Sequence, residues 1–255
     1  MKRQEAESVA LYGRNAVLAA VRAGRSIQRI VLDEGASLRD ERVRELVALC
    51  ESRGVTVARS ARRELDLMVS GAQHQGVVAL VSAAAPVRLQ DVLERCERDG
   101  KDPCLLLLRD VAHSQNLGAI LRTAEATGVD AVIVPTRQPP RLAEAARIAM
   151  GAAEYVPVIA QSLMQVATVL RRKGIRLIGA DAAAEKSFWD CDLTGPVGFV
   201  LGGEHAGLKG PLAEACDELV RIPMVGRISS LNVSVACALL LYERLRQITH
   251  PSERT

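Results

Sequence analysis

From Pro103 onward, short apolar runs alternate with helix-like segments, and this alternation restricts the possible folds more than any other feature of the chain. Strands are expected at 104–108, 131–134, 156–159, 176–180, 197–201 and 218–222, most of which are apolar runs. Helices are expected between or after them, at 117–127, 141–150, 162–173, 212–215 and 230–247. Such alternation is typical of a mostly parallel sheet with helices on both faces, so the sequence predicts an α/β domain.

The segment before residue 83 has the pattern of a separate, smaller α/β unit. Helices are expected at 15–23 and 42–53, and strands at 27–32, 55–57 and 76–81. Residues 82–86 have the composition of a linker, and a short helix is expected after them at 89–98. We therefore predict one domain over 8–82 and another over 103–249, joined by a linker and short helix over 83–102.

The composition excludes several classes of protein. With 49% hydrophobic and 25% charged residues, the chain is neither collagen-like nor wholly disordered. Its six cysteines form no C-x-x-C pair and its four histidines lie apart from them, which predicts free thiols and no metal site. A signal peptide and an apolar run long enough to cross a bilayer are both missing, so we expect a cytoplasmic protein without a membrane partner.

The charge leaves a nucleic-acid partner open. The formal net charge is only +3, and aromatic residues make up 2% of the chain, too few for an extensive base-stacking platform. Arg14, Arg22 and Arg25 lie on or beside the first helix, where Arg22 and Arg25 share a face. These arginines fit phosphate binding and, equally well, an ordinary solvated surface.

Three polar loops that contain glycine follow strands of the predicted parallel sheet, at 109–118, 202–210 and 223–232. Ligands of such sheets bind beyond the carboxyl ends of the strands, so these loops are the candidate site. The second loop lacks both G-x-G-x-x-G and G-K-[ST]. This argues against one alternative, an α/β enzyme that uses another nucleotide on a small metabolite.

Polar residues in the first and third loops exceed what helix capping needs. Asn116 is expected to cap the helix that follows it, and Arg122 lies less than two turns further along a helix that the sheet should largely bury. A buried arginine needs a partner. Ser230 or Asn232 is expected to cap the last helix, but capping accounts for only one of the polar residues between 229 and 234.

Taken together and in order, the three loops resemble the motifs of a known family. They read N-x-G-x-x-x-R over 116–122, L-G-x-E-x-x-G-L over 201–208 and I-P-M-x-G-x-x-S-S-L-N-V-S-V-A over 222–236. This series resembles the three motifs of the SpoU (TrmH-like) ribose 2'-O-methyltransferases of the SPOUT superfamily. Near the start, L-Y-G over 11–13 and G-x-x-H-Q-G-V over 71–77 resemble the amino-terminal substrate-binding domain of the ribosomal-RNA branch.

The resemblance implies a fold, a cofactor and an assembly. The fold would be a carboxy-terminal SPOUT-type α/β trefoil-knot domain with a mostly parallel sheet, preceded by a small α/β ribosomal-protein-like domain. The protein would be a homodimer that binds S-adenosylmethionine in the knotted loops. The residues implied to hold this cofactor are Leu201, Gly202, Gly203, Ile222, Met224 and Leu231.

The implied activity is methyl transfer from S-adenosylmethionine to a ribose 2'-hydroxyl of structured RNA, with ribosomal RNA favoured. The implied catalytic residues are Asn116, Arg122, Glu204, Ser230 and Asn232, and those implied to contact RNA are Arg14, Arg22, Arg25, His74 and Gln75. Arg122 would stabilise the developing alkoxide electrostatically, Glu204 would orient Arg122 or Asn116, and no metal would be required.

The first motif departs from the family pattern. Residues 109–110 are Arg-Asp where the family usually has Asp-Gly-like residues, and residues 113–115 are His-Ser-Gln where an Asp-Pro-like pair is usual. Asn116 itself is kept and only the residues beside it differ. The differences are therefore expected to affect which substrate is bound more than the catalytic step. Two alternatives remain open at this point: a transfer-RNA ribose methyltransferase, and a catalytically inactive RNA-binding protein of SPOUT fold.

Overall fold

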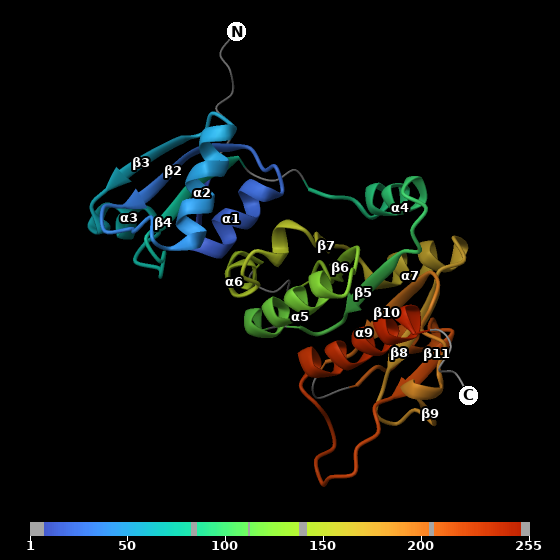
Figure 1. The fold of residues 1–255 in the computed structure, drawn as a ribbon. Coiled ribbons are helices and arrows are strands. Elements are labelled where there is room, and N and C mark those ends of the chain that lie inside the picture. The colour runs from blue at the N-terminus through green and yellow to red at the C-terminus, as the bar shows by residue number, and fades with distance from the viewer. Residues whose placement is uncertain (1–7, 83–85, 112, 138–141, 204–206, 251–255) are drawn as a thin grey trace. The chain divides into compact units, whose positions relative to one another are not determined.

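The computed structural model describes residues 8–82, 86–111, 113–137, 142–203 and 207–250 (Figure 1). The chain divides into two compact units, Met1–Pro86 with Met150–Tyr155, and Val87–Ala149 with Val156–Thr255. Among the described residues, no helix is long and apolar enough to cross a membrane, and no three His, Cys, Asp or Glu side chains gather as metal ligands would.

The first unit is built on a four-stranded sheet in the order β1-β4-β2-β3. Its strands are β1 (Ser8–Tyr12), β2 (Ile27–Asp33), β3 (Thr56–Ser60) and β4 (Val77–Ser82), and its α-helices are α1 (Arg14–Arg22), α2 (Glu41–Ser52) and α3 (Arg62–Met68). Strand β4 pairs antiparallel with both β1 and β2, whereas β2 and β3 are parallel. The predicted small α/β unit is confirmed.

Two elements of the first unit were not predicted from the sequence. Strand β1 has the sequence SVALY, a short apolar run next to the chain's start, and none of its residues is fully buried. Helix α3 buries only Leu65, so it lacks an apolar stripe at helical spacing. Leu65 nevertheless packs with Val31, Val69 and Val78 in a small cluster of its own, which covers one face of the sheet.

The second unit contains a seven-stranded sheet in the order β7-β6-β5-β10-β8-β11-β9. Its strands are β5 (Cys104–Leu108), β6 (Ala131–Val134), β7 (Val158–Ala160), β8 (Arg176–Ala180), β9 (Lys186–Ser187), β10 (Val197–Leu201) and β11 (Glu218–Arg221). Each neighbouring pair is parallel, which confirms the predicted mostly parallel sheet. The knotted path of the chain stays a prediction from the family resemblance.

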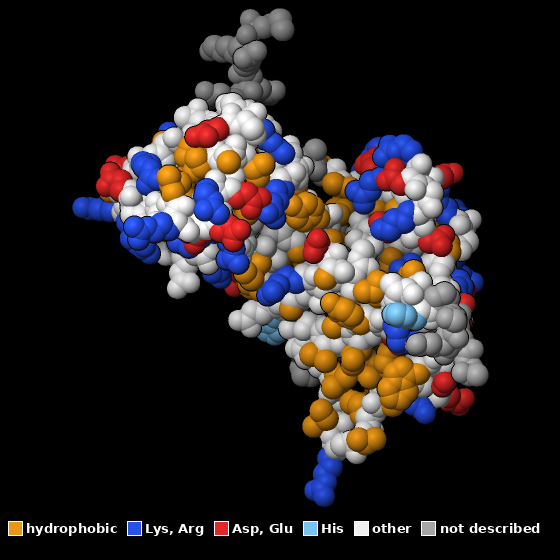
Figure 2. All heavy atoms as spheres, in the orientation of Figure 1, with side chains coloured by type: hydrophobic (Ala, Val, Ile, Leu, Met, Phe, Trp, Pro, Cys, Tyr) orange, Lys and Arg blue, Asp and Glu red, His pale blue; other side chains and the backbone are white. Residues whose placement is uncertain are grey.

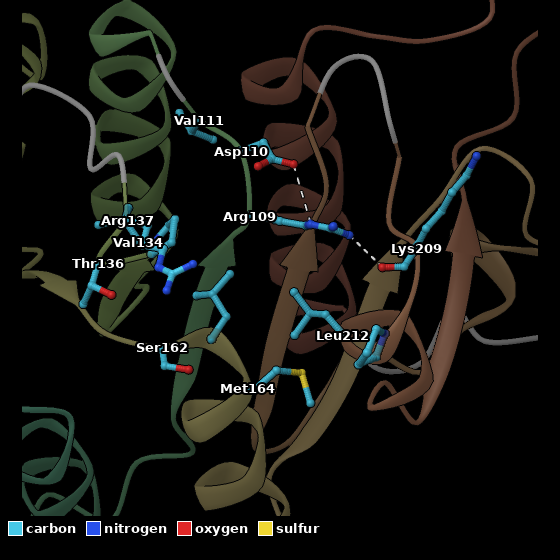
Figure 3. Close-up of a pocket in the computed structure, with 13 residues that line it drawn as sticks. Arg109, Asp110, Val111, Val134, Thr136, Arg137, Ser162, Met164, Lys209 and Leu212 are labelled. Carbon is cyan, nitrogen blue, oxygen red and sulfur yellow. Dashed lines mark hydrogen bonds and ion pairs between the residues drawn. The ribbon is translucent and has the colours of Figure 1, made fainter.

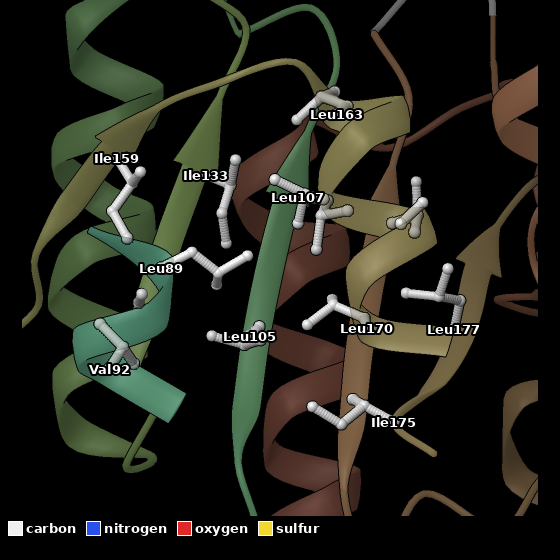
Figure 4. Packing of buried hydrophobic residues seen from close by; sticks show 14 of the residues in the cluster. Leu89, Val92, Leu105, Leu107, Ile133, Ile159, Leu163, Leu170, Ile175 and Leu177 are labelled. Atoms are coloured by element: carbon white, nitrogen blue, oxygen red, sulfur yellow. The ribbon is translucent and has the colours of Figure 1, made fainter. Parts of the chain in front are cut away.

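Helices cover both faces of this sheet. They are α4 (Leu89–Arg98), α5 (Ser114–Ala126), α6 (Leu142–Ile148), α7 (Leu163–Arg172), α8 (Pro211–Glu214) and α9 (Val233–Thr249). Figure 4 shows α4 and α7 on one face, packed against alternate residues of β5, with α5 and α9 behind the sheet. Helix α4, which the sequence placed between the domains, contributes Leu89, Val92, Leu93 and Cys96 to this core and therefore lies in the second unit.

All six cysteines are free thiols, as the sequence predicted. Five are buried, and Cys216 is partly buried. Burial raises the pKa of Cys104 to about 11 and that of Cys216 to about 12. Because the thiolate is the reactive form, these side chains act as small apolar groups of the core.

Candidate functional site

A cavity of about 360 Å³ opens at the carboxyl ends of β8, β10 and β11. All six residues that the sequence assigned to the cofactor line it: Leu201, Gly202, Gly203, Ile222, Met224 and Leu231. Ser230, assigned to the reaction, lines it as well. The second and third predicted loops, separated in sequence by residues 211–222, therefore meet at one cavity. We call it the cofactor cavity below.

Two glycines shape one wall of the cofactor cavity. A Cβ atom at Gly202 would lie 2.3 Å from the carbonyl oxygen of Gly207 and 2.8 Å from the backbone nitrogen of Leu208. Gly203 pairs with Gly207 through an antiparallel bridge, and a Cβ at Gly203 would lie 2.6 Å from the Cβ of Asp110. The backbone therefore returns so closely on itself that only glycine fits at Gly202, which is more than a plain tight turn requires.

Asp181 connects the segment after β8 to the 202–208 loop, and the sequence did not predict this role. Its Oδ2 accepts a hydrogen bond from the backbone N–H of Leu208 at 2.9 Å, and its Oδ1 accepts one from the N–H of Ala183 at 2.8 Å. Asp181, Ala182 and Ala183 all line the cavity. The available signal was their place directly after strand 176–180, at the same sheet edge as the glycine-containing loops.

The structure brings Asn116 and Asn232 together from opposite ends of the second unit's sequence. The Nδ2 group of Asn232 donates to Oδ1 of Asn116 at 3.1 Å. Asn232 is the N-cap of α9 and accepts from the backbone N–H of Ser234 at 2.8 Å, so one of the two predicted caps is confirmed. The predicted cap at Asn116 is wrong, because α5 begins at Ser114 after its N-cap, His113.

Arg122 differs from the expectation of a buried arginine. Its side chain is exposed, because the buried stripe of α5 consists of Leu117, Gly118, Ile120, Leu121 and Ala124 and leaves Arg122 outside it. Arg122 lies six positions after Asn116 in the helix, which corresponds to ~9 Å along the axis. Arg122 is not among the residues that line the cofactor cavity. Glu204, also predicted as catalytic, lies outside the described residues.

The arginines predicted to contact RNA already make ion pairs within the first unit. Arg14 binds Asp40 at 2.6 Å, Arg22 binds Glu45 at 2.5 Å, and Arg25 binds Glu154 at 2.7 Å. The Arg25–Glu154 pair is largely buried, and burial raises the pKa of Glu154. Arg25 therefore has a structural contact, whereas Arg14 and Arg22 keep 36% and 52% of their side chains exposed.

His74 and Gln75, also predicted to contact RNA, differ in their exposure. The His74 side chain is fully buried, with Nε2 3.0 Å from Oδ1 of Asp66 and Nδ1 accepting the N–H of Gly76. The prediction that this ring touches RNA is therefore corrected: it fixes the turn before β4. Gln75 is exposed and accepts the N–H of Arg14 at 3.2 Å, so Arg14 and Gln75 form one surface group.

Comparison with known proteins places these features in a family. The family model described as SpoU rRNA Methylase family matches residues 103–242, and the model described as RNA 2'-O ribose methyltransferase substrate binding matches residues 10–87. The chain belongs to the SpoU rRNA methylase family. The first match falls mostly in the second compact unit and contains the three predicted motifs, and the other match falls almost entirely in the first unit.

Individual SpoU relatives support the same conclusion. The 23S rRNA (guanosine-2'-O-)-methyltransferase RlmB of Pseudomonas syringae pv. tomato is 42% identical over 93% of this chain and 95% of its own. AviRb of Streptomyces viridochromogenes, solved in complex with AdoMet, is 25% identical and superposes with a TM-score of 0.76 over 97% of this chain and 93% of its own. The TrmH/SpoU tRNA modifying enzyme of A. aeolicus superposes with a TM-score of 0.54 and 25% identity over 63% of this chain and 85% of its own.

This SpoU protein is an RNA 2'-O-ribose methyltransferase, and S-adenosylmethionine is its cofactor. The comparisons thereby decide against an inactive RNA-binding protein and against an enzyme of small metabolites. The fold prediction is confirmed for the α/β architecture and for the order of an amino-terminal domain followed by a SPOUT domain.

Replacing Asp181 with alanine is expected to weaken S-adenosylmethionine binding about tenfold. The substitution removes the hydrogen bond that connects Asp181 to the 202–208 loop and the one that fixes the turn at Ala183, at ~0.5–1.5 kcal/mol each. Calorimetric titration measures the affinity. Asp99→Ala, an exposed aspartate at the end of α4, is the matched control. Equal affinities for both variants would show that Asp181 does not position the wall.

Proposed function

We propose that this protein transfers the methyl group of S-adenosylmethionine to the 2'-hydroxyl of a guanosine in 23S ribosomal RNA. The observation that carries this proposal is the extent of the match. The relative named for that reaction aligns over 93% of the chain, through both units, whereas the tRNA modifying enzyme of A. aeolicus aligns over 63%. The match to the ribosomal-RNA enzyme thus includes the amino-terminal unit. This favours ribosomal RNA over transfer RNA as the substrate.

Within this proposal, the cofactor cavity holds S-adenosylmethionine against the backbone of its two loops. Gly202, Ile222 and Leu231 supply the surrounding backbone, with Met224 beside them. The tight return of the chain at Gly202 leaves room for a ligand next to exposed backbone N–H and C=O groups. When bound, the cofactor supplies an electrophilic methyl group.

The hydrogen-bonded pair of Asn116 and Asn232, together with Ser230, is proposed to orient the ribose. Their amide and hydroxyl groups both donate and accept, so they can hold a 2'-hydroxyl in line for attack. The hydroxyl loses its proton to solvent water as its oxygen attacks, and this oxygen carries increased negative charge until its bond to the methyl carbon is formed. The guanidinium of Arg122 stabilises that charge but does not accept the proton, because an arginine stays protonated in proteins.

A homodimer through α9 is also part of the proposal. Val235, Leu239 and Tyr242 lie on one face of α9 and are exposed by 47%, 39% and 53%. Figure 2 shows apolar side chains gathered over this helix. Contiguous apolar patches of this kind mark interaction surfaces. In a two-fold homodimer the same patch of both subunits is buried, so a second copy of this chain is the proposed partner. The second subunit would also bring an Arg122 that is exposed in its own chain.

Leu239→Glu is expected to convert the dimer into monomers, because two carboxylates would be buried at the two-fold axis. Sedimentation velocity measures the change in mass. Ile248→Glu is the matched control, since Ile248 is 44% exposed on the same helix but lies on a different face. A Leu239→Glu protein that sediments like the wild type would refute this interface.

The proposed reaction is tested by methyl transfer from labelled S-adenosylmethionine to unmodified transcripts of 23S rRNA, 16S rRNA and a transfer-RNA pool. Nucleoside mass spectrometry then identifies the product. We expect 2'-O-methylguanosine in the 23S transcript alone. Label in transfer RNA only, or on another nucleoside, would refute the proposed substrate.

A further inference from the structure

A second and larger cavity, of about 850 Å³, opens at the carboxyl ends of β5 and β6 (Figure 3). Arg109 and Asp110 line it after β5, Thr136 and Arg137 after β6, and Ser162 at the start of α7. The segment 109–110 is the one in which the chain departs from its family's usual pattern.

The second cavity is next to the cofactor cavity. Lys209 lines both of them, and Asp110, a residue of the second cavity, contacts Gly203 of the cofactor cavity so closely that a Cβ at Gly203 would lie 2.6 Å from the Cβ of Asp110. When the reacting ribose of an RNA lies at the cofactor cavity, a neighbouring nucleotide would therefore reach the second cavity.

The charged groups of the second cavity fit a phosphate. Arg109 is fixed in place, because Nη1 donates to the Lys209 carbonyl oxygen at 2.6 Å and Nε lies 3.6 Å from Oδ2 of Asp110. Arg137 is exposed and makes no hydrogen bond or ion pair with any residue that the structure describes. In Figure 3, Arg137 lies on the wall with Thr136 and Ser162, opposite Lys209. An arginine fork with free donors is well suited to phosphate oxygens.

The start of α7 adds a weaker attraction for an anion. Ser162 is its N-cap, yet the serine side chain makes no capping hydrogen bond, which leaves N–H donors of this ten-residue helix available. The positive end of the helix dipole lies at the same place. The remaining wall is apolar, formed by Val134, Leu163, Met164 and Leu212. Apolar surface beside a cationic rim suits a nucleobase attached to a phosphate.

We propose that the second cavity binds a nucleotide that flanks the methylated one, with its phosphate on Arg137 and Arg109 and its base against Leu163 and Met164. This inference rests on the proposed function as an RNA ribose methyltransferase. It assigns the unusual Arg109-Asp110 pair to the choice of RNA sequence or shape around the target rather than to methyl transfer itself.

The test compares Arg137→Ala with the wild type in binding to a 23S rRNA transcript over a range of salt concentrations. We expect the dissociation constant to rise about tenfold. The slope of log K against log salt should become shallower by about 0.7–1, the effect of one lost phosphate contact. The affinity for S-adenosylmethionine should not change, because Arg137 does not line the cofactor cavity.

Arg172→Ala is the matched control, since it removes one exposed arginine from the far end of α7, roughly 14 Å along the helix from the cavity. Equal salt slopes for Arg137→Ala and Arg172→Ala would overturn the inference, because the weaker RNA binding would then reflect only the loss of one positive charge anywhere on the surface. Free guanosine monophosphate that binds as tightly as RNA would also overturn it in favour of a small-ligand site. Binding is measured without turnover, so failure of the proposed methylation is seen separately.

Discussion

Gly202→Ala is expected to lower the affinity for S-adenosylmethionine at least 100-fold, which corresponds to ~2.7 kcal/mol. The added methyl group would lie 2.3 Å from the Gly207 carbonyl oxygen and 2.4 Å from its carbon. Both atoms belong to the backbone, so no side-chain rotation can relieve the overlap. The loop must open, and Gly202, Gly203 and Gly207 together form a wall of the cofactor cavity. Calorimetric titration of the purified variant measures the loss.

Gly35→Ala is the matched control for Gly202→Ala. A Cβ at Gly35 meets only Oδ1 of Asp33 at 3.7 Å, an ordinary contact, and Gly35 lies in the other unit. The far-ultraviolet circular dichroism of both variants should match that of the wild type, which shows that the fold survives. Wild-type cofactor affinity in a folded Gly202→Ala protein would mean that the cofactor does not bind against this loop.

The sequence predicted well those features that depend on local pattern. Strands β5, β6 and β10 have the expected bounds because each is a continuous apolar run buried in a parallel sheet. The six residues predicted to hold the cofactor line one cavity because the family motifs mark loops at one sheet edge. Strand bounds and motif positions are both determined by residues close together in the sequence.

The features that the sequence missed depend on contacts between distant segments. The hydrogen bond between Asn116 and Asn232 joins residues 116 positions apart, and Asp181 reaches Leu208 across 27 positions. His74 matched a family position, but its burial against Asp66 is set by the packing of α3, a helix that the sequence did not reveal. Arg122 was expected inside because its helix packs on the sheet, yet the buried stripe of that helix excludes it.

Arg122→Ala is expected to lower the rate of methyl transfer about 100- to 1,000-fold while cofactor affinity stays unchanged, the typical result of removing one group that stabilises a developing oxyanion. The binding half of this expectation follows from the structure, since Arg122 does not line the cofactor cavity. Single-turnover kinetics at saturating RNA measure the chemical step. Arg147→Ala, at another exposed arginine in the same unit, is the control.

Mixed dimers formed through the proposed α9 interface decide which subunit's reaction Arg122 serves. We expect it to serve the partner's, because it is exposed, stands almost two turns from Asn116 and lies on α5, which packs beside α9. A dimer that joins one Arg122→Ala chain to one Gly202→Ala chain then keeps one intact site: the first chain supplies the cofactor cavity and the second supplies the arginine. Such dimers, purified through two different tags, should recover about half of the wild-type rate. If Arg122 instead serves its own chain, neither site is complete and the mixed dimer will be as inactive as the two parent variants.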